Sequence, residues 1–329
     1  MRYDSCRSHP SSCLGKKLSN WGILFSVAYC ADNAEYLRRA TVSALSLHAA
    51  NPEVFDDVYF LIPDHLEQLF RSVRMRMPSD LSMRVRAVRF DPVDTSGLFV
   101  DKWASPATYG RLFLPDLVDE DVSFLLYLDA DTMVVGDVSE LAPICQTLAT
   151  SGFPFAAVAY TNLDQCHIER LEGIGVDFRF HLSAGVLLMD LNQWRQQEIS
   201  NRALEIVRTM GNRLEYWDQD ALNILQGPNY LPLAGRYNNL WWDSMSNPSI
   251  IHYAGKDKPG WRPGAFPADA EYWQYLRATF SPSSAIFFDL ARKCTRVTGF
   301  INVRLKTLLR GYRGLRRIAK RLTQMLLGG

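Results

Sequence analysis

The chain has few cysteines, no long apolar run and no low-complexity tract, and each absence excludes a class of protein. Its six cysteines are scattered without a CxxC pair, which fits a reducing cytosol better than a disulfide framework. No run of about eighteen apolar residues occurs, which argues against a conventional membrane-spanning helix. The first 22 residues contain no apolar run of about seven, so no cleavable secretory signal is predicted. The sequence therefore indicates a soluble or peripheral globular protein.

Acidic residues are missing from the end of the chain. The whole sequence has 36 Lys and Arg against 35 Asp and Glu, but residues 291–329 hold eleven basic residues and no acidic one. Residues 1–290 consequently have ten more acidic than basic groups. We expect three parts: a poorly ordered leader over 1–22, a catalytic domain over 23–280 and a basic tail over 281–329 that begins with a Ser-Pro-Ser-Ser linker.

The basic tail has helical periodicity over residues 301–327. Apolar residues from Leu305 to Leu326 recur at steps of three and four, with Lys and Arg on the other side. Each basic side chain near an anionic bilayer contributes at most about 1 kcal/mol, so their sum predicts reversible attachment to an anionic membrane surface. A helix packed on the catalytic domain is the alternative, and no nucleic acid is expected because aromatic stacking residues are nearly absent. We predict a cytoplasmic protein, peripheral on the cytoplasmic face of the membrane.

Short apolar runs alternate with helical periodicity in the first part of the chain. Strands are expected at Ile23–Ala28, Val58–Ile62, Val85–Phe90 and Phe124–Leu128. Helices are expected over residues 36–49, 64–77 and 106–117, with Pro78 ending the second. Later strands are expected at 184–189 and 250–251. The alternation predicts an α/β fold with a mostly parallel central sheet and helices on both faces.

Two carboxylates directly follow the fourth expected strand, in Tyr127-Leu-Asp-Ala-Asp-Thr-Met-Val134. In such sheets ligands bind outside the carboxyl ends of the strands. Asp129 and Asp131 could both face one divalent cation, which prefers hard oxygen ligands and bridges nucleotide phosphates. A solvated turn is the alternative for a pair standing alone, since aspartate is common in turns.

A second segment, His252-Tyr-Ala-Gly-Lys-Asp-Lys-Pro259, offers groups that suit a metal–diphosphate site. A neutral imidazole supplies a third metal ligand, a glycine lets the backbone approach a phosphate, and a lysine neutralises diphosphate charge. Taken singly, His252 is more often structural and Lys258 more often a solvated charge. Together with the two carboxylates they could form a complete site.

Two further segments suit a sugar. Trp217-Asp-Gln-Asp-Ala-Leu-Asn223 is expected on a helix, where Asp218, Gln219 and Asp220 are adjoining polar groups for sugar hydroxyls. A helix N-terminus enriched in acidic residues is the alternative. The small residues of Ser183-Ala-Gly185 would let a sugar approach the backbone, or they only begin a strand.

In this order the motifs resemble a retaining glycosyltransferase of family 8, the group of glycogenin and the bacterial lipooligosaccharide galactosyl- and glucosyltransferases. The similarity covers residues 23–275. Within this range it includes the segments Thr108-Tyr-Gly-Arg-Leu112 and Ser183-Ala-Gly-Val-Leu-Leu-Met-Asp-Leu-Asn-Gln-Trp194. It implies a nucleotide-binding fold of the GT-A type. It also implies Mn²⁺, with Mg²⁺ as the alternative, held by Asp129, Asp131 and His252.

The resemblance further implies roles for residues around the cation. Asp218 and Gln219 would be catalytic and face the sugar, and Gly255 and Lys258 would bind the diphosphate. Residues expected to bind the donor are Asp32, Arg111, Ala130, Ser183, Ala184, Gly185, Gly255 and Lys258.

This chain departs from the family pattern in several places. Cys30 stands where an acidic residue usually holds the uracil, and Asp32 is the candidate replacement. Ser183 stands where asparagine is common, and Gly260 separates Pro259 from Trp261. A further sugar-contacting aspartate, expected near residues 160–164, has no unambiguous counterpart.

The implied activity is transfer of galactose or glucose from a UDP-sugar, with retention, to a glycan or glycolipid acceptor such as lipopolysaccharide or another surface polysaccharide. An amide such as Gln219 is a poor nucleophile, so same-face attack is favoured over a covalent intermediate. A catalytically inactive nucleotide-sugar-binding or membrane adaptor protein of the same fold is the alternative, supported by the altered uracil strand. Nucleotidyl transfer, a second enzyme alternative, does not explain the segment from His252 to Pro259.

Overall fold

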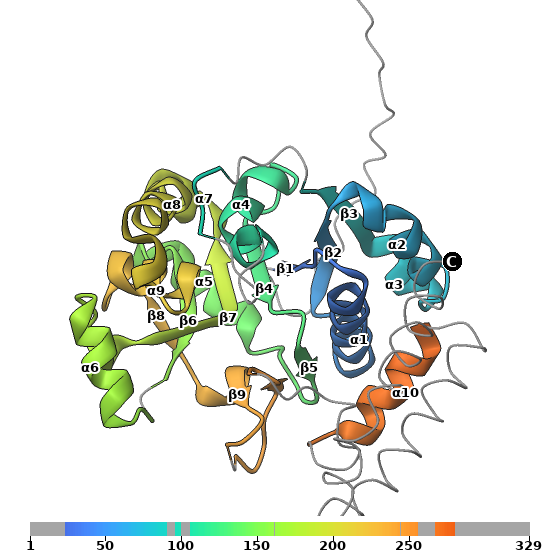
Figure 1. Ribbon diagram of the computed structural model, residues 1–329. Helices are drawn as coiled ribbons and strands as arrows, with labels where there is room; N and C mark the ends of the chain where they lie inside the picture. Colours follow the sequence, from blue (N-terminus) through green and yellow to red (C-terminus); the bar gives the residue numbers. More distant parts are fainter. Residues whose placement is uncertain are drawn as a thin grey trace, which may run out of the picture.

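The structure of the chain is a computed structural model that describes residues 24–90, 96–99, 106–160, 162–243, 245–255 and 267–279 (Figure 1). A seven-stranded sheet has the order β3-β2-β1-β4-β7-β6-β8. The strands are Phe25–Cys30 (β1), Phe55–Ile62 (β2), Val85–Arg89 (β3), Phe124–Leu128 (β4), Phe155–Ala159 (β6), Leu182–Asp190 (β7) and Leu231–Leu233 (β8). Only β7 runs against its neighbours β4 and β6, and the other pairs are parallel. The predicted α/β class with a mostly parallel sheet is confirmed.

Helices cover both faces of this sheet, as predicted. One core lies under α1 (Ala34–Ala50), α2 (Glu67–Arg74), α3 (Ser79–Arg84) and α5 (Leu141–Ser151). The other lies under α4 (Gly110–Leu117), α7 (Leu191–Gln196), α8 (Ile199–Met210) and α9 (Trp217–Gln226). Because successive side chains of a strand point to opposite faces, Val27 and Tyr29 enter the first core, whereas Ala28 and Cys30 enter the second.

Some predicted boundaries were wrong. The first strand lies two residues later than expected, at Phe25–Cys30. The helix expected over residues 64–77 is a short 3₁₀ turn, Asp64–Leu66, followed by α2, which ends at Arg74. Pro78 precedes a separate helix, α3, because proline fits the start of a helix as well as it stops one.

A second, three-stranded sheet has the order β5-β10-β9, formed by Thr132–Val134, Ile250–His252 and Asn239–Leu240 respectively. β10 runs antiparallel to β5 with His252 opposite Thr132, and Tyr253 N donates to Asp131 O over 2.9 Å. This register brings His252 beside the acidic turn that follows β4. Helix α10 (Asp269–Thr279) packs on α1 and lies at the lower right of Figure 1.

The strand order reverses between β1 and β4. From β1 the chain continues outward to β2 and β3, then returns to β4 on the other side of β1. In open α/β sheets a crevice forms at such a point, outside the carboxyl ends of the strands. The residues that follow β1 and β4 therefore face a common space.

The expected leader (1–22), the basic tail (281–329) and Lys258 lie outside the described residues. Cys30, Cys145 and Cys166 carry free thiols. Within the described ranges, no helix has the length and apolar character that a membrane crossing requires.

We expect Asn51 to stabilise the fold by joining the end of α1 to the segment after β5. Its Nδ2 donates to Gly136 O and its Oδ1 accepts from Val138 N, both over 3.0 Å, and the residue is buried. Asn51→Ala removes both hydrogen bonds, so the free energy of unfolding in urea should fall by about 1–3 kcal/mol. Asn192→Ala, at an exposed position of α7, should change it by less than about 0.5 kcal/mol. Equal losses in the two variants would contradict this bridging role.

Candidate active site

Two carboxylates and an imidazole converge where β4 meets the small sheet. Asp129 and Asp131 lie in the turn between β4 and β5, and His252 ends β10. His252 Nε2 lies 3.6 Å from Asp129 Oδ2 and 3.3 Å from Asp131 Oδ1. One ligand atom from each residue lies within 4.8 Å of the others. The three predicted metal ligands thus come together from distant parts of the chain.

The ring of His252 is fixed by Asn238. The Asn238 Nδ2 donates to Ser183 Oγ over 3.0 Å, so its Oδ1 faces His252 Nδ1, at 2.9 Å. Because an amide oxygen only accepts, Nδ1 carries a proton, and Nε2 faces the two carboxylates. The two carboxylates repel one another, and a divalent cation bound by them and by Nε2 of a neutral ring would replace the repulsion by attraction. The residues present therefore fit a bound divalent cation.

Strand β7 passes directly behind this cluster. A Cβ added to Gly185 would lie 2.2 Å from His252 Cε1 and 3.0 Å from Asp129 Oδ2. The carbonyl of Gly185 also accepts a hydrogen bond from Asp129 N over 2.8 Å. Glycine is required here because the backbone approaches the ligands so closely. We call Asp129, Asp131 and His252 the cation cluster. Three residues of β7 that were predicted to bind the donor lie behind this cluster and support it, namely Ser183, Ala184 and Gly185.

Arg111, on α4, joins the cation cluster to α9. It is 6% exposed, and its Nη2 lies 3.0 Å from Asp129 Oδ1 while its Nε lies 2.6 Å from Asp218 Oδ2. Its Nη1 donates to the carbonyl of Ala184. The guanidinium group stacks 4.6 Å from the ring centre of Tyr127, whose hydroxyl donates to Asp129 Oδ1 over 2.7 Å. Burial opposes the charge, but the two carboxylates outweigh burial and raise the pKa of Arg111.

Asp218 and Gln219 stand at the start of α9. Burial raises the pKa of Asp218 to about 6, an effect that Arg111 offsets only in part. Gln219 Oε1 accepts a hydrogen bond from Ala184 N over 3.0 Å, which fixes the orientation of the amide. Arg111 therefore holds Asp218 as well as Asp129, and strand β7, which passes behind the cation cluster, also holds Gln219.

A pocket of about 440 Å³ opens at the carboxyl ends of β1 and β4. Its size and its mixture of aromatic and charged groups suit a small polar molecule. The half-buried Asp32 presents a carboxylate to the pocket, whereas burial raises the pKa of the Cys30 thiol. Gly255 follows β10 with φ of +92°, a conformation that favours glycine. The residues lining the pocket are Cys30, Ala31, Asp32, Asn33, Tyr36, Ala107, Thr108, Arg111, Tyr127, Asp129, Ala130, Asp131, Tyr216, Trp217, Asp218 and Gln219.

Asp220 was grouped with Asp218 and Gln219 from the sequence, and for Asp220 that prediction was wrong. Its two oxygens accept from Arg170 over 2.9 and 3.2 Å, and it does not line the pocket. Each helical residue turns the side chain by about 100°, so two steps along α9 carry Asp220 away from the face of Asp218.

Three contributors to the site had no sequence signal of their own. Asn238 orients His252, and Tyr36 and Tyr216 line the pocket. None belongs to a motif, and a lone asparagine or tyrosine occurs on any surface. The acidic first turn of α9 could have drawn attention to Tyr216, its N-cap residue.

Comparison with known proteins places these residues in a family. The profile described as "Glycosyl transferase family 8" matches residues 26–263. The lipopolysaccharide 1,2-glucosyltransferase of Escherichia coli is 27% identical over 268 residues, 76% of either chain. The lipopolysaccharide 1,3-galactosyltransferase of Salmonella typhimurium is 26% identical, over 76% of this chain and 77% of its own.

Solved structures share the fold. A crystal structure of the galactosyltransferase LgtC in complex with donor and acceptor sugar analogs has a TM-score of 0.67 to this chain at 21% identity. The match covers 80% of this chain and all of that one. It confirms the GT-A type arrangement that the resemblance implied.

We expect Gly185→Ala to weaken cation binding, because its Cβ must displace His252 or Asp129. Mn²⁺ affinity, measured by electron paramagnetic resonance of the free ion, should fall by at least about tenfold, as for other changes that disturb ligand orientation. Gly173→Ala is the matched control, since a Cβ there meets nothing within 4 Å. Wild-type Mn²⁺ affinity in Gly185→Ala would mean that His252 and Asp129 do not share a cation.

Proposed function

The chain belongs to glycosyl transferase family 8, and on this basis we propose that it transfers galactose or glucose from a UDP-sugar to a glycan with retention of configuration. Family membership supports a transferase activity and confirms the resemblance drawn from the sequence. The observation that carries the proposal is the convergence of Asp129, Asp131 and His252, of which the two carboxylates line a pocket of suitable size.

Asp129, Asp131 and His252 would hold the Mn²⁺, with Mg²⁺ as the alternative. When bound, the cation stabilises negative charge on a departing diphosphate. Gly255 and Lys258, which follow His252 in the sequence, are proposed to meet the same diphosphate. Lys258 would add a second positive charge.

The nucleotide is proposed to lie along the carboxyl end of β1. Cys30 is buried and its thiol is neutral, so it cannot replace the carboxylate that usually holds a uracil. Asp32 lines the same pocket two residues later and accepts a hydrogen bond from Asn33 Nδ2 over 2.9 Å. We propose that Asp32 takes over the uracil contact.

The hexose is proposed to lie against Asp218 and Gln219. Asp218 is 2% exposed and ion-paired with Arg111, and the oxygen of Gln219 accepts the N–H of Ala184. Asp218 Oδ2 would have to leave Arg111, and Gln219 Oε1 the N–H of Ala184, before either atom could bond to the sugar. This arrangement favours same-face attack, in which the leaving phosphate takes the proton of the acceptor hydroxyl. A glycosyl-enzyme trapped on Asp218 would contradict it.

The acceptor is proposed to be a lipopolysaccharide or another surface polysaccharide. This proposal rests on the relatives from Escherichia coli and Salmonella typhimurium, whose names specify lipopolysaccharide. A glycolipid acceptor agrees with the basic tail proposed to bind the membrane.

We expect one UDP-sugar of a panel to be hydrolysed fastest when Mn²⁺ is present, and Asp131→Ala to abolish this turnover. The variant loses a cation ligand but little core packing, so its unfolding temperature should stay near that of the wild type. Asp116→Ala, at an exposed position on α4, is the matched control and should turn over normally. UDP binding that depends on Mn²⁺ and persists unchanged in Asp131→Ala would refute the metal assignment.

The same panel tests the alternative of an inactive binding protein. That protein would bind UDP with Mn²⁺ but release no UDP from any donor or acceptor combination. Release of UDP by the wild type and not by Asp131→Ala would exclude an inactive protein, and a glycosylated acceptor would establish transfer.

We expect the basic tail to attach the protein reversibly to anionic membranes on the cytoplasmic face. The full-length protein should sediment with anionic liposomes at low salt, less so at high salt, and not with neutral ones. A version ending at Phe280 should stay in the supernatant and still hydrolyse the UDP-sugar. Equal sedimentation of both forms at low salt would show that the tail is not the anchor.

A further inference from the structure

A partly buried ion pair holds the start of α9, and neither of its residues lines the pocket. Asp220 is fully buried, and Arg170 of helix α6 (Gln165–Gly173) binds both of its oxygens, over 2.9 and 3.2 Å. Two parallel N–H donors to one carboxylate fix the relative direction of the two groups. The proposed chemistry uses neither residue, so the pair needs another explanation.

The carboxylate of Asp220 also fixes the backbone before α9. Its Oδ2 accepts from Glu215 N over 2.9 Å and from Tyr216 N over 3.0 Å. These N–H groups precede the first turn of the helix, where backbone donors lack helical partners. One oxygen of Asp220 therefore receives hydrogen bonds from both the turn and Arg170.

The turn held in this way forms part of the pocket wall. Tyr216 and Trp217 line the pocket immediately before Asp218 and Gln219. Trp217 has φ of +42°, which is unfavourable for a residue with a bulky side chain and persists only where its surroundings impose it. The hydrogen bonds to Asp220 flank this strained residue and supply that constraint.

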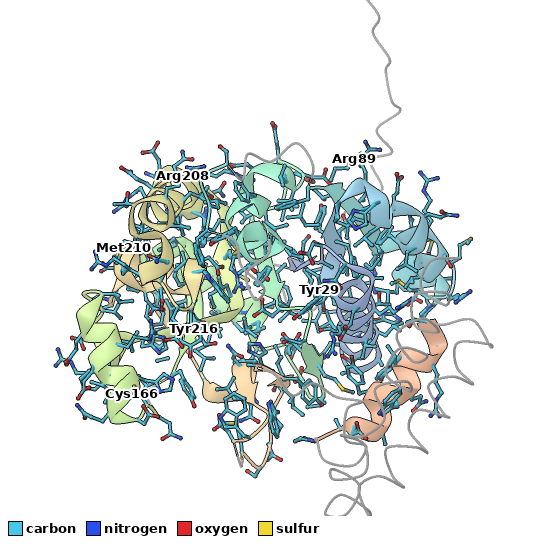
Figure 2. The ribbon with its side chains drawn as sticks, in the orientation of Figure 1. Tyr29, Arg89, Cys166, Arg208, Met210 and Tyr216 are labelled. Carbon is cyan, nitrogen blue, oxygen red and sulfur yellow. The ribbon has the colours of Figure 1, made fainter. Side chains whose placement is uncertain are left out.

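Arg170 also contacts the wall directly. Its guanidinium carbon lies 4.8 Å from the ring centre of Tyr216, and its Nε lies 3.4 Å from Glu215 Oε2. Among the residues of α6 only Leu171 is buried, so the helix has little packing of its own. Figure 2 labels Cys166 of α6 at the lower left and Tyr216 above it and to its right. Arg170 thus reaches from a peripheral helix to the back of the pocket wall.

We propose that Arg170 is a positioning residue for the transfer reaction. Through Asp220 and the ring of Tyr216 it keeps Tyr216 and Trp217 in the conformation that aligns the hexose beside Asp218 and Gln219. The part of this inference that concerns the reaction rests on the proposed function, whereas the part that concerns the conformation of the turn does not. An ion pair with one buried partner is weak support for stability alone, and the proposed role of this one is to fix the geometry of a strained turn.

The test compares Arg170→Met with the wild type in the full chain. For the preferred UDP-sugar, kcat for transfer should fall by about 10-fold to 100-fold, the effect expected when reacting groups are displaced by about 1 Å. Mn²⁺-dependent UDP affinity and the KM of the donor should stay within about twofold, because the cation cluster lies elsewhere. Hydrogen–deuterium exchange at the amides of Glu215 and Tyr216 should become faster.

Three further variants serve as controls. Arg170→Lys should recover part of kcat, since it keeps the charge but cannot bind both oxygens or stack on Tyr216 in the same way. Arg179→Met breaks an exposed ion pair with Asp177 and should leave kcat unchanged. If Arg170→Met does not fold because it strands a buried carboxylate, Arg170→Met with Asp220→Asn removes that charge and is measured in its place.

Wild-type kcat together with wild-type amide exchange would overturn the inference. So would a parallel loss of UDP affinity, kcat and unfolding temperature, because that pattern marks a general loss of structure. If the wild type transfers no sugar, the proposed function fails, and amide exchange decides the inference alone: faster exchange at Glu215 and Tyr216 supports it, and unchanged exchange overturns it.

Discussion

Arg111 makes the contacts on which the geometry of the site depends. One guanidinium group binds Asp129 after β4, Asp218 on α9 and the carbonyl of Ala184 on β7. Its donors have a rigid, planar arrangement, so the three partners can occupy only one relative position if all are bound. Lysine could not reproduce this, because it carries a single ammonium. The cation cluster and the groups proposed to meet the hexose therefore share one support.

The sequence predicted the features that depend on local order. Apolar runs predicted the strands. Because Asp129 and Asp131 directly follow the apolar run of β4, their position at the carboxyl edge of the sheet was predicted as well. The contact between His252 and Asp131 depends instead on the pairing of β5 with β10, which are far apart in the chain. The residue types suggested His252 as a third ligand and the family resemblance supported it, but single-chain patterns carry no information on which short strands pair.

The sequence could not predict which residues orient other side chains of the site. Asn238 matters because its amide stands between Ser183 and His252, and Arg170 because it lies behind Tyr216. Neither side chain differs in type from many surface residues, so the role comes entirely from tertiary position. Asp220 shows the converse error: adjacency in sequence suggested a shared face, but the helical rotation separates it from Asp218.

The charges in the pocket would link binding of the proposed cation to binding of the proposed nucleotide. Among the described residues that line it, four carboxylates, of Asp32, Asp129, Asp131 and Asp218, face one guanidinium group, that of Arg111. A diphosphate entering such a pocket alone would add negative charge to an excess of it, in surroundings where burial strengthens repulsion. A divalent cation reverses the sign of this interaction for one part of the pocket only, next to Asp129 and Asp131. Because coupling between two ligands is reciprocal, a diphosphate bound there must tighten the cation as much as the cation tightens the diphosphate. Under the proposed function, the acidic site would therefore select a nucleotide that arrives with its metal and disfavour the free anion.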